Sequence, residues 1–217
     1  MRKQVLAVLL FGGAVCAQAG VLTFTSEPLF QSQGVIWHNT NWDSFVGGFY
    51  YPGDPYTIGG VTYTSTNNLI ATPGTGYGNA RSVILNNYWS PLPGAISTSP
   101  DAFDMFGFNI GLLGSTSLVD IQLNSNLGSY SFLGLSFPNV NTGLAFQGFI
   151  TDNPAEYFTG FTLTSQGGGG YAPAITDVQL GQTGAVIPEP STLAFVACGV
   201  LGLAFYRRMR PARASST

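Results

Sequence analysis

Short segments in which apolar and polar residues alternate recur along the chain, and each is bounded by glycine, proline, asparagine or serine. In DMFGFNIGLL (104–113) the side chains of Phe106, Phe108 and Ile110 fall on one face, and SLVDIQL (117–123) alternates in the same way. A period of two is typical of a strand that buries one face. Comparable segments lie at 21–25, 61–65, 82–86, 129–137, 143–150, 158–164 and 174–180.

These segments predict an all-β fold, an antiparallel β-sandwich of jelly-roll type. No window between 20 and 182 shows a helical period, so we expect no helix there. The glycines on the second face of 104–113 predict a bulge or the close approach of another strand. In 174–180 we expect Thr176, Val178 and Leu180 to share one face.

The N-terminal segment 1–19 has the layout of a secretory signal peptide. Arg2 and Lys3 precede an apolar stretch, and the small-residue site Ala-Gln-Ala ends at Ala19. This pattern predicts export and cleavage before Gly20.

The C-terminal part contains an uncharged apolar run within 192–206, which we expect to be one short transmembrane helix. Its fourteen residues from Leu193 onward would reach roughly 21 Å, against the ~30 Å of bilayer hydrocarbon. Arg207, Arg208 and Arg210 follow at once, and the positive-inside bias predicts that the tail 207–217 stays in the cytoplasm. The run is preceded by a linker, 182–191.

The segment 186–213 joins four parts in order: Pro188-Glu189-Pro190, the pair Ser191-Thr192, a Gly/Ala/Leu-rich span and the arginines. It resembles the PEP-CTERM sorting signal of exported proteins in exopolysaccharide-producing Gram-negative bacteria. The resemblance implies an exosortase partner, a membrane-embedded cysteine protease that reads the Pro-Glu-Pro element and passes the protein from the inner membrane to the cell surface or outside. Such segments are also labelled ice-binding protein C-terminal domains, a label that carries no evidence of ice binding. An ordinary single-pass anchor with a proline-rich stalk is the alternative.

The expected exported domain, 20–181, is acidic and free of cysteine. From 20 to 189 the chain has ten acidic residues and one basic residue, Arg81, which gives a net charge of −9. Such a surface does not bind a phosphate backbone, so nucleic acid is excluded as a partner. Cys16 and Cys198 lie in the two hydrophobic ends, so no disulfide staples the domain and its stability must come from a core.

The residues for common catalytic chemistry are scarce, and we expect no cofactor and no catalytic residue. His38 is the only histidine, and no G-x-S-x-G surrounds a serine. Zinc lacks His and Cys ligands. A glycosidase needs two facing carboxylates, and a pair from the acids of the central region is the remaining enzymatic alternative: Asp101, Asp104, Asp120, Asp152 and Glu156.

Two clusters of acids in expected loops are weak calcium candidates. SPDAFD (99–104) contains Asp101 and Asp104, and TDNPAE (151–156) contains Asp152 and Glu156. Loop carboxylates suit Ca²⁺, but neither stretch is a dedicated calcium loop. Solvated turn carboxylates are the alternative.

An aromatic-rich stretch at 36–56, which we expect to be a long loop, is the candidate binding surface. Trp37, Trp42, Tyr50 and Tyr51 lie there among polar residues, as in modules that stack sugar rings on exposed aromatic faces. The alternative is that half of the aromatic rings in this stretch point into the core and the rest edge a long loop. Exposure of Trp37 or Trp42 would support glycan binding, and burial of both would exclude it.

Three functions remain open. The preferred one is a noncatalytic exported protein, sorted to the cell surface or extracellular polysaccharide matrix. The second is a carbohydrate-binding module that binds exopolysaccharide in that matrix. The third is a glycan-acting enzyme.

Overall fold

The computed structural model describes most of the expected exported domain, in the ranges 17–18, 20–42, 48–50, 55–64, 69–72, 83–86, 91–113, 118–166 and 172–184. These residues belong to a compact unit that ends at Gly184. The second unit, Ala185–Thr217, holds the expected membrane span, the tail and most of the expected linker, and it lies outside the described residues, as does most of the expected signal peptide. The linker was expected to begin at Gln182, but Gln182 and Thr183 still belong to the last strand, β15 (Ala172–Thr183). None of the helices in the described ranges is long and apolar enough to cross a membrane.

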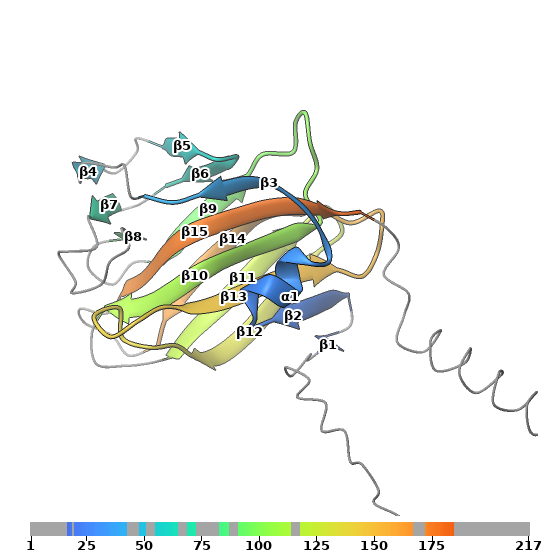
Figure 1. Ribbon diagram of the computed structural model, residues 1–217. Helices are drawn as coiled ribbons and strands as arrows, with labels where there is room; N and C mark the ends of the chain where they lie inside the picture. Colours follow the sequence, from blue (N-terminus) through green and yellow to red (C-terminus); the bar gives the residue numbers. More distant parts are fainter. Residues whose placement is uncertain are drawn as a thin grey trace, which may run out of the picture. The chain divides into compact units, whose positions relative to one another are not determined.

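The first of two sheets has nine strands, and all of their pairings are antiparallel (Figure 1). Eight of them follow one path: β1 (Ala17–Gln18), β2 (Val21–Phe24), β13 (Ala145–Thr151), β10 (Met105–Leu113), β15 (Ala172–Thr183), β8 (Val83–Asn86), β7 (Leu69–Thr72) and β4 (Gly48–Tyr50). The ninth strand, β3 (Gly34–Thr40), pairs with the C-terminal part of β15.

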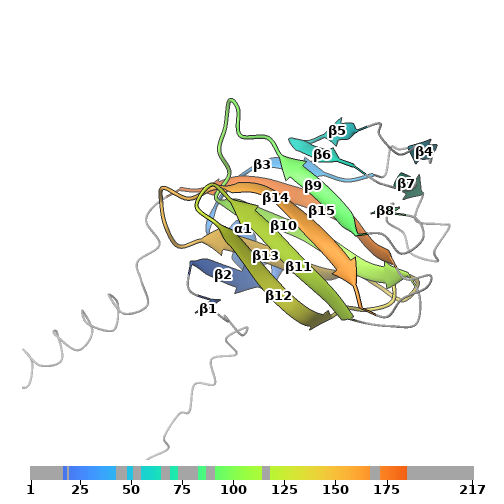
Figure 2. The ribbon, with the colours of Figure 1, turned by 180° about the vertical axis from the view of Figure 1, so that it is seen from behind.

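The second sheet has six strands and is seen in front in Figure 2. Its order is β12 (Ser129–Ser136), β11 (Leu118–Ser125), β14 (Phe158–Ser165), β9 (Leu92–Ile96), β6 (Val61–Tyr63) and β5 (Tyr56–Ile58). Its pairings are antiparallel as well.

One apolar core is shared by the two sheets. Phe106 of β10 stacks on Phe161 of β14 with ring centroids 4.8 Å apart. The predicted alternation is confirmed in β10 and β11, whose inward side chains are fully buried: Phe106, Phe108, Ile110, Val119, Ile121 and Leu123. Two antiparallel sheets around one core are consistent with the predicted β-sandwich.

A short helix, α1 (Glu27–Gln31), corrects the expectation that the domain has no helix. Five residues are too few to show a helical period, and the helix is held by packing rather than by its own propensity. Its Phe30 is fully buried and lies 5.3 Å from the ring of Phe146. A Cβ on Gly107 would lie 2.8 Å from Phe146 and 3.1 Å from Phe30, so the close approach predicted at the glycines of β10 is made by α1 as well as by the neighbouring strand β13.

Two further expectations about strands were wrong. Residues 34–40 form β3, although we expected a loop from 36 onward, because local sequence does not reveal that β15 offers this segment an edge to pair with. In β15 the register shifts opposite Phe108, and Asp177 has a φ of +48°. This bulge places Thr176 in register with Asn109, whereas Val178 joins the core, so the expected shared face is broken.

Candidate functional site

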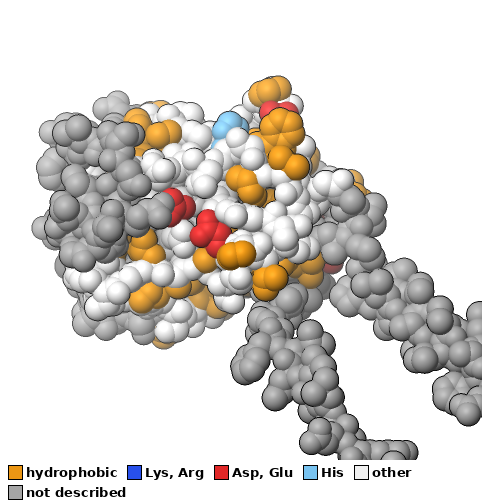
Figure 3. Space-filling model, in the orientation of Figure 1, with side chains coloured by type: hydrophobic (Ala, Val, Ile, Leu, Met, Phe, Trp, Pro, Cys, Tyr) orange, Lys and Arg blue, Asp and Glu red, His pale blue; other side chains and the backbone are white. Residues whose placement is uncertain are grey.

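Hydrogen bonds from uncharged donors hold most of the acidic side chains that the structure describes. The described ranges contain seven acidic residues and no lysine or arginine. Figure 3 shows acidic groups and a histidine on a face that is otherwise apolar or uncharged. Amide, hydroxyl or backbone N–H donors bond six of these seven carboxylates, those of Glu27, Asp104, Asp120, Asp152, Glu156 and Asp177.

Glu27 and Asp177 illustrate this arrangement on the outer side of the first sheet. The Glu27 carboxylate accepts from Gln31 at 3.1 Å and also from the fully buried Gln179 of β15. Asp177 accepts from the Asn109 side-chain amide at 3.0 Å. These contacts tie α1 to β15 and stabilise the bulge, so we assign both acids a structural role.

The four calcium candidates contact different parts of the domain and do not form one cluster. Asp104 accepts from the backbone N–H of Thr183 at 2.8 Å, Asp152 from that of Gly20 at 3.2 Å, and Asp101 lines a pocket. In the described ranges no group of three His, Cys, Asp or Glu residues is placed to hold a metal ion. We therefore carry the calcium prediction no further.

Glu156 is the most deeply buried of these acids, with 3% of its surface exposed. Its Oε1 accepts from the hydroxyl of Ser125 and from that of Tyr130, the latter at 2.7 Å. The hydrogen bond to Glu156 and desolvation raise the pKa of Tyr130 to about 12. The carboxylate thus links the loop after β13 to β11 and β12.

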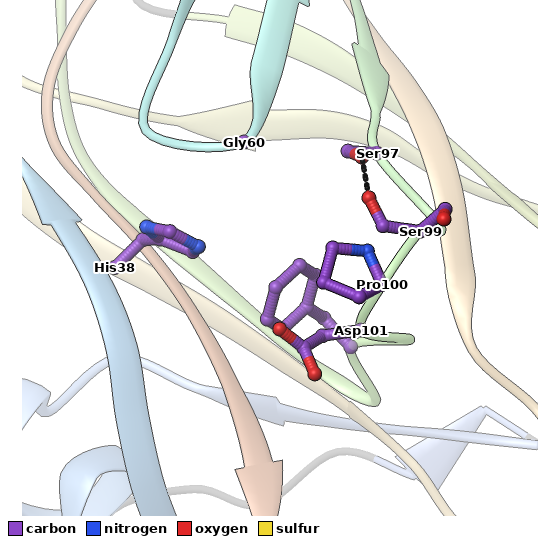
Figure 4. Close-up of a pocket in the computed structure, with 7 residues that line it drawn as sticks. His38, Gly60, Ser97, Ser99, Pro100 and Asp101 are labelled. Atoms are coloured by element: carbon purple, nitrogen blue, oxygen red, sulfur yellow. Dashed lines mark hydrogen bonds between the residues drawn. The ribbon is translucent and has the colours of Figure 1, made fainter.

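A pocket of about 220 Å³ lies at the turn between β5 and β6 (Figure 4). His38 of β3 points into it, and the loop after β9 supplies Ser97, Ser99, Pro100 and Asp101 on the opposite side. Gly60 and Phe103 complete the lining; the rings of His38 and Phe103 are in an edge-to-face contact at 5.5 Å.

The pocket has limited chemical capacity. Its volume of about 220 Å³ is smaller than the roughly 300–1,000 Å³ of typical ligand sites, so it is too small to enclose a large substrate. Its lining includes one imidazole and one carboxylate, Asp101. Two-carboxylate glycosidase chemistry requires a second facing acid, which this lining does not contain.

The four aromatic candidates for sugar stacking differ in their exposure to solvent. Trp37 is 56% exposed, whereas Trp42 is 0% exposed and packs against Tyr63 at 5.6 Å, so Trp42 presents no face for stacking. Tyr50 is the last residue of β4, and its side chain, like all of Tyr51, lies outside what the structure describes. The stacking prediction therefore rests on Trp37.

Trp37 lies on the exposed face of β3, at a point where the strand is irregular. Ile36 is in register with Gly181 and His38 with Leu180, so Trp37 is the extra residue of a bulge, a feature that re-aims side chains. Val35, Trp37 and Asn39 are the exposed residues of this strand. The indole of Trp37 offers an exposed apolar ring face, and the Asn39 carboxamide two residues away offers a hydrogen-bond donor and acceptor.

Sequence reasoning missed the polar residues that accompany these candidates. Asn39, Ser97 and Ser99 carry no motif. Ser97 and Ser99 meet His38 at the pocket only through the path of the loop after β9, whereas Asn39 lies on the other, exposed face of β3 beside Trp37. The sorting residues Pro188, Glu189, Pro190, Ser191, Thr192, Arg207, Arg208 and Arg210 lie outside the described residues.

No protein-family model matches the chain, and no curated protein matches it. Among solved structures, the chain is similar to a mutant of the carbohydrate-binding module CBM29-2, from work on ligand recognition by family 29 modules. The TM-score is 0.32 and the identity 13%, over 84% of this chain and 99% of that one. A likeness this low carries no conclusion about this chain.

Proposed function

We propose that this protein is a noncatalytic exported protein that an exosortase-type system sorts to the cell surface or extracellular polysaccharide matrix. One observation supports the proposal above all: the Pro-Glu-Pro segment begins directly after the compact unit ends at Gly184 and is followed by a short apolar run and arginines. A signal peptide exports such a chain, and the basic tail halts it in the inner membrane. Pro188, Glu189 and Pro190 are then substrate residues, read by another enzyme.

Mass spectrometry of the mature C-terminus, on protein from the cell envelope and the medium, tests this route. We expect a C-terminus near Pro190 in the mature form. Replacing Pro188, Glu189 and Pro190 by alanine should leave an uncleaved inner-membrane form. The matched control replaces Ser215, Ser216 and Thr217 by alanine and should be processed normally. A mature chain that still ends at Thr217, or normal processing of the Pro-Glu-Pro variant, would refute the sorting assignment.

The exported domain itself we assign to the jelly-roll type. Its support is the path of the chain, since β10, β13 and β15 lie in the first sheet while β9, β11, β12 and β14 lie in the second. Repeated passage between two sheets is the behaviour of Greek-key sandwiches.

A second candidate function, binding of exopolysaccharide, is favoured by the exposure of Trp37. The indole lies on the bulged strand β3 with Asn39 on the same exposed side. Stacking of a sugar on an aromatic ring requires this kind of exposed face. The proposal concerns a binding surface and assigns no reaction to it.

Affinity electrophoresis in gels that contain the producer's own exopolysaccharide tests the binding proposal. We expect the protein to be retarded and Trp37→Ala to migrate about as fast as in a gel without polysaccharide. Leu133→Ala is the matched control, because Leu133 is 72% exposed on β12 in the other sheet. Equal retardation of the two variants would remove Trp37 as the site, and shortening of the polysaccharide on incubation would favour the glycan-acting enzyme.

A further inference from the structure

Gly20, the first residue expected after signal-peptide cleavage, is bonded to the loop that follows β13. Its backbone N–H donates to Oδ2 of Asp152 at 3.2 Å, and the N–H of Asp152 donates to the Gly20 carbonyl at 3.1 Å. This reciprocal pair joins residues 132 positions apart in the sequence. It holds the start of β2 against the folded domain.

Two features of this place require glycine. Gly20 has a φ of +103°, a backbone conformation that residues with a side chain rarely adopt. A Cβ at this position would also lie 2.6 Å from Oη of Tyr130 and 2.9 Å from its Cε1. The Tyr130 hydroxyl is itself held by Glu156 at 2.7 Å, so the ring is not free to move aside.

Cleavage changes the charge of the Gly20 nitrogen. Hydrolysis of the Ala19–Gly20 bond by a signal peptidase consumes one water, leaves a carboxylate on Ala19 and creates an amine on Gly20 that takes up a proton. A nitrogen 3.2 Å from a carboxylate oxygen is within ion-pair distance once it is an ammonium. Lys3 is the only lysine of the chain and leaves with the signal peptide, so this ammonium becomes the only primary amine of the mature chain.

We propose that cleavage before Gly20 completes an ion pair between the new α-ammonium and the carboxylate of Asp152, so that maturation fastens β2 to the domain. This inference rests on the proposed export of the chain. Removal of 1–19 also removes β1, which pairs with β2 through Gln18 and Ala17. The ion pair thus strengthens the start of β2 at the step that takes its neighbouring strand away.

The titratable groups that face the Gly20 nitrogen are Asp152 and Tyr130, with Glu156 behind the tyrosine. Because the hydrogen bond to Glu156 holds the pKa of Tyr130 at about 12, this phenol stays protonated between pH 6 and 10. A titration in that window therefore reports the amine. An amine paired with a carboxylate keeps its proton to higher pH than the ~7.7–8.0 of an ordinary α-amino group.

The test uses the mature protein recovered from producing cells. Mass spectrometry first establishes that its N-terminus is Gly20, and the rate of amine acylation is then measured by the same method at a series of pH values. The reference is the same protein in urea. The variants are Asp152→Asn and, as a control with the same change in charge, Asp101→Asn.

We expect the midpoint of acylation in the native protein to lie above that of the unfolded protein by about 0.15–0.7 pH units, which corresponds to the roughly 1.4- to 5-fold effect of an exposed ion pair. Asp152→Asn should remove this difference, and Asp101→Asn should keep it. Equal midpoints in native and unfolded protein would overturn the proposal, as would an unchanged difference in Asp152→Asn. An N-terminus elsewhere would refute the cleavage on which it depends, so the two failures are distinguishable.

Discussion

Replacing Phe30 by alanine should detach α1 from the outer side of the first sheet. The Phe30 ring is fully buried, with centroids 5.3 Å from Phe146 and 6.0 Å from Phe24. Phe→Ala changes in cores cost about 3–5 kcal/mol, the sum of lost transfer energy and the remaining cavity. Because a helix of five residues can partly collapse into the space, we expect about 3 kcal/mol, the lower end of that range.

The assay is urea unfolding of the mature protein, monitored by circular dichroism. The two proteins can be compared directly if the variant keeps the m-value of the unaltered protein. Leu29→Ala is the matched control, since Leu29 is the neighbouring residue of α1 and is 50% exposed; we expect a change within about 0.5 kcal/mol. A loss in Phe30→Ala as small as that of the control would refute the role of the ring as the anchor of α1.

A double-mutant cycle identifies the contact that carries the effect. A Cβ on Gly148 would lie 2.7 Å from the Phe30 ring and 2.8 Å from Phe146. Gly148→Ala should therefore cost about 1–3 kcal/mol through overpacking, and much of that cost should disappear when Phe30 is alanine as well. Strict additivity would mean that the glycine does not make room for Phe30.

Three further predictions concern the core. Tyr63→Phe should stabilise the domain by about 1 kcal/mol, measured by urea unfolding. The buried hydroxyl of Tyr63 has no hydrogen-bond partner among the described residues, and phenylalanine keeps the contacts of the ring. Gly94→Ala should destabilise it by about 1–3 kcal/mol, since a Cβ there would overlap the Phe161 ring; a loss below about 0.5 kcal/mol would show that the ring can yield. Burial raises the pKa of Tyr63 strongly, so the native state keeps a proton that the unfolded chain releases above pH ~10. The free energy of unfolding should therefore fall as the pH rises beyond that point, and it should fall more steeply in the unaltered protein than in Tyr63→Phe. Tyr130 adds to this loss between pH ~10 and its pKa of about 12, so a flat stability between pH 9 and 11 would contradict the argument.

The strands that could be read from the sequence are those with regular alternation. β10, β11, β12, β13 and β14 lie close to their predicted bounds, because each is long and has one face of apolar side chains or is flanked by clear turn residues. The helix α1 and the strand β5 have too few residues to show a period, and β9 contains Pro93 and Gly94, which are depleted in strands.

For the candidate binding surface, the sequence did not decide which of the two tryptophans is exposed and which is buried. Trp37 and Trp42 lie five positions apart in a stretch of similar composition, yet one is exposed and the other fully buried. Trp37 is exposed with Val35 and Asn39 on one face of β3, whereas Trp42 lies beyond the end of that strand and packs against Tyr63 in the core. Which face of β3 is covered depends on how the strand pairs with β15, and the local sequence does not contain that information.

Alternation along a strand is a local property, since successive side chains point to opposite faces whatever the neighbouring strand is. For this reason the inward faces of β10 and β11, the antiparallel β class and the acidic, cysteine-free character of the domain were readable from the chain alone. Pairing partners, registers and bulges depend on contacts between segments far apart in sequence. The bulges at Trp37 and Asp177, the burial of Phe30 between glycines, and the meeting of Gly20 with Asp152 across 132 positions arise only when the strands assemble.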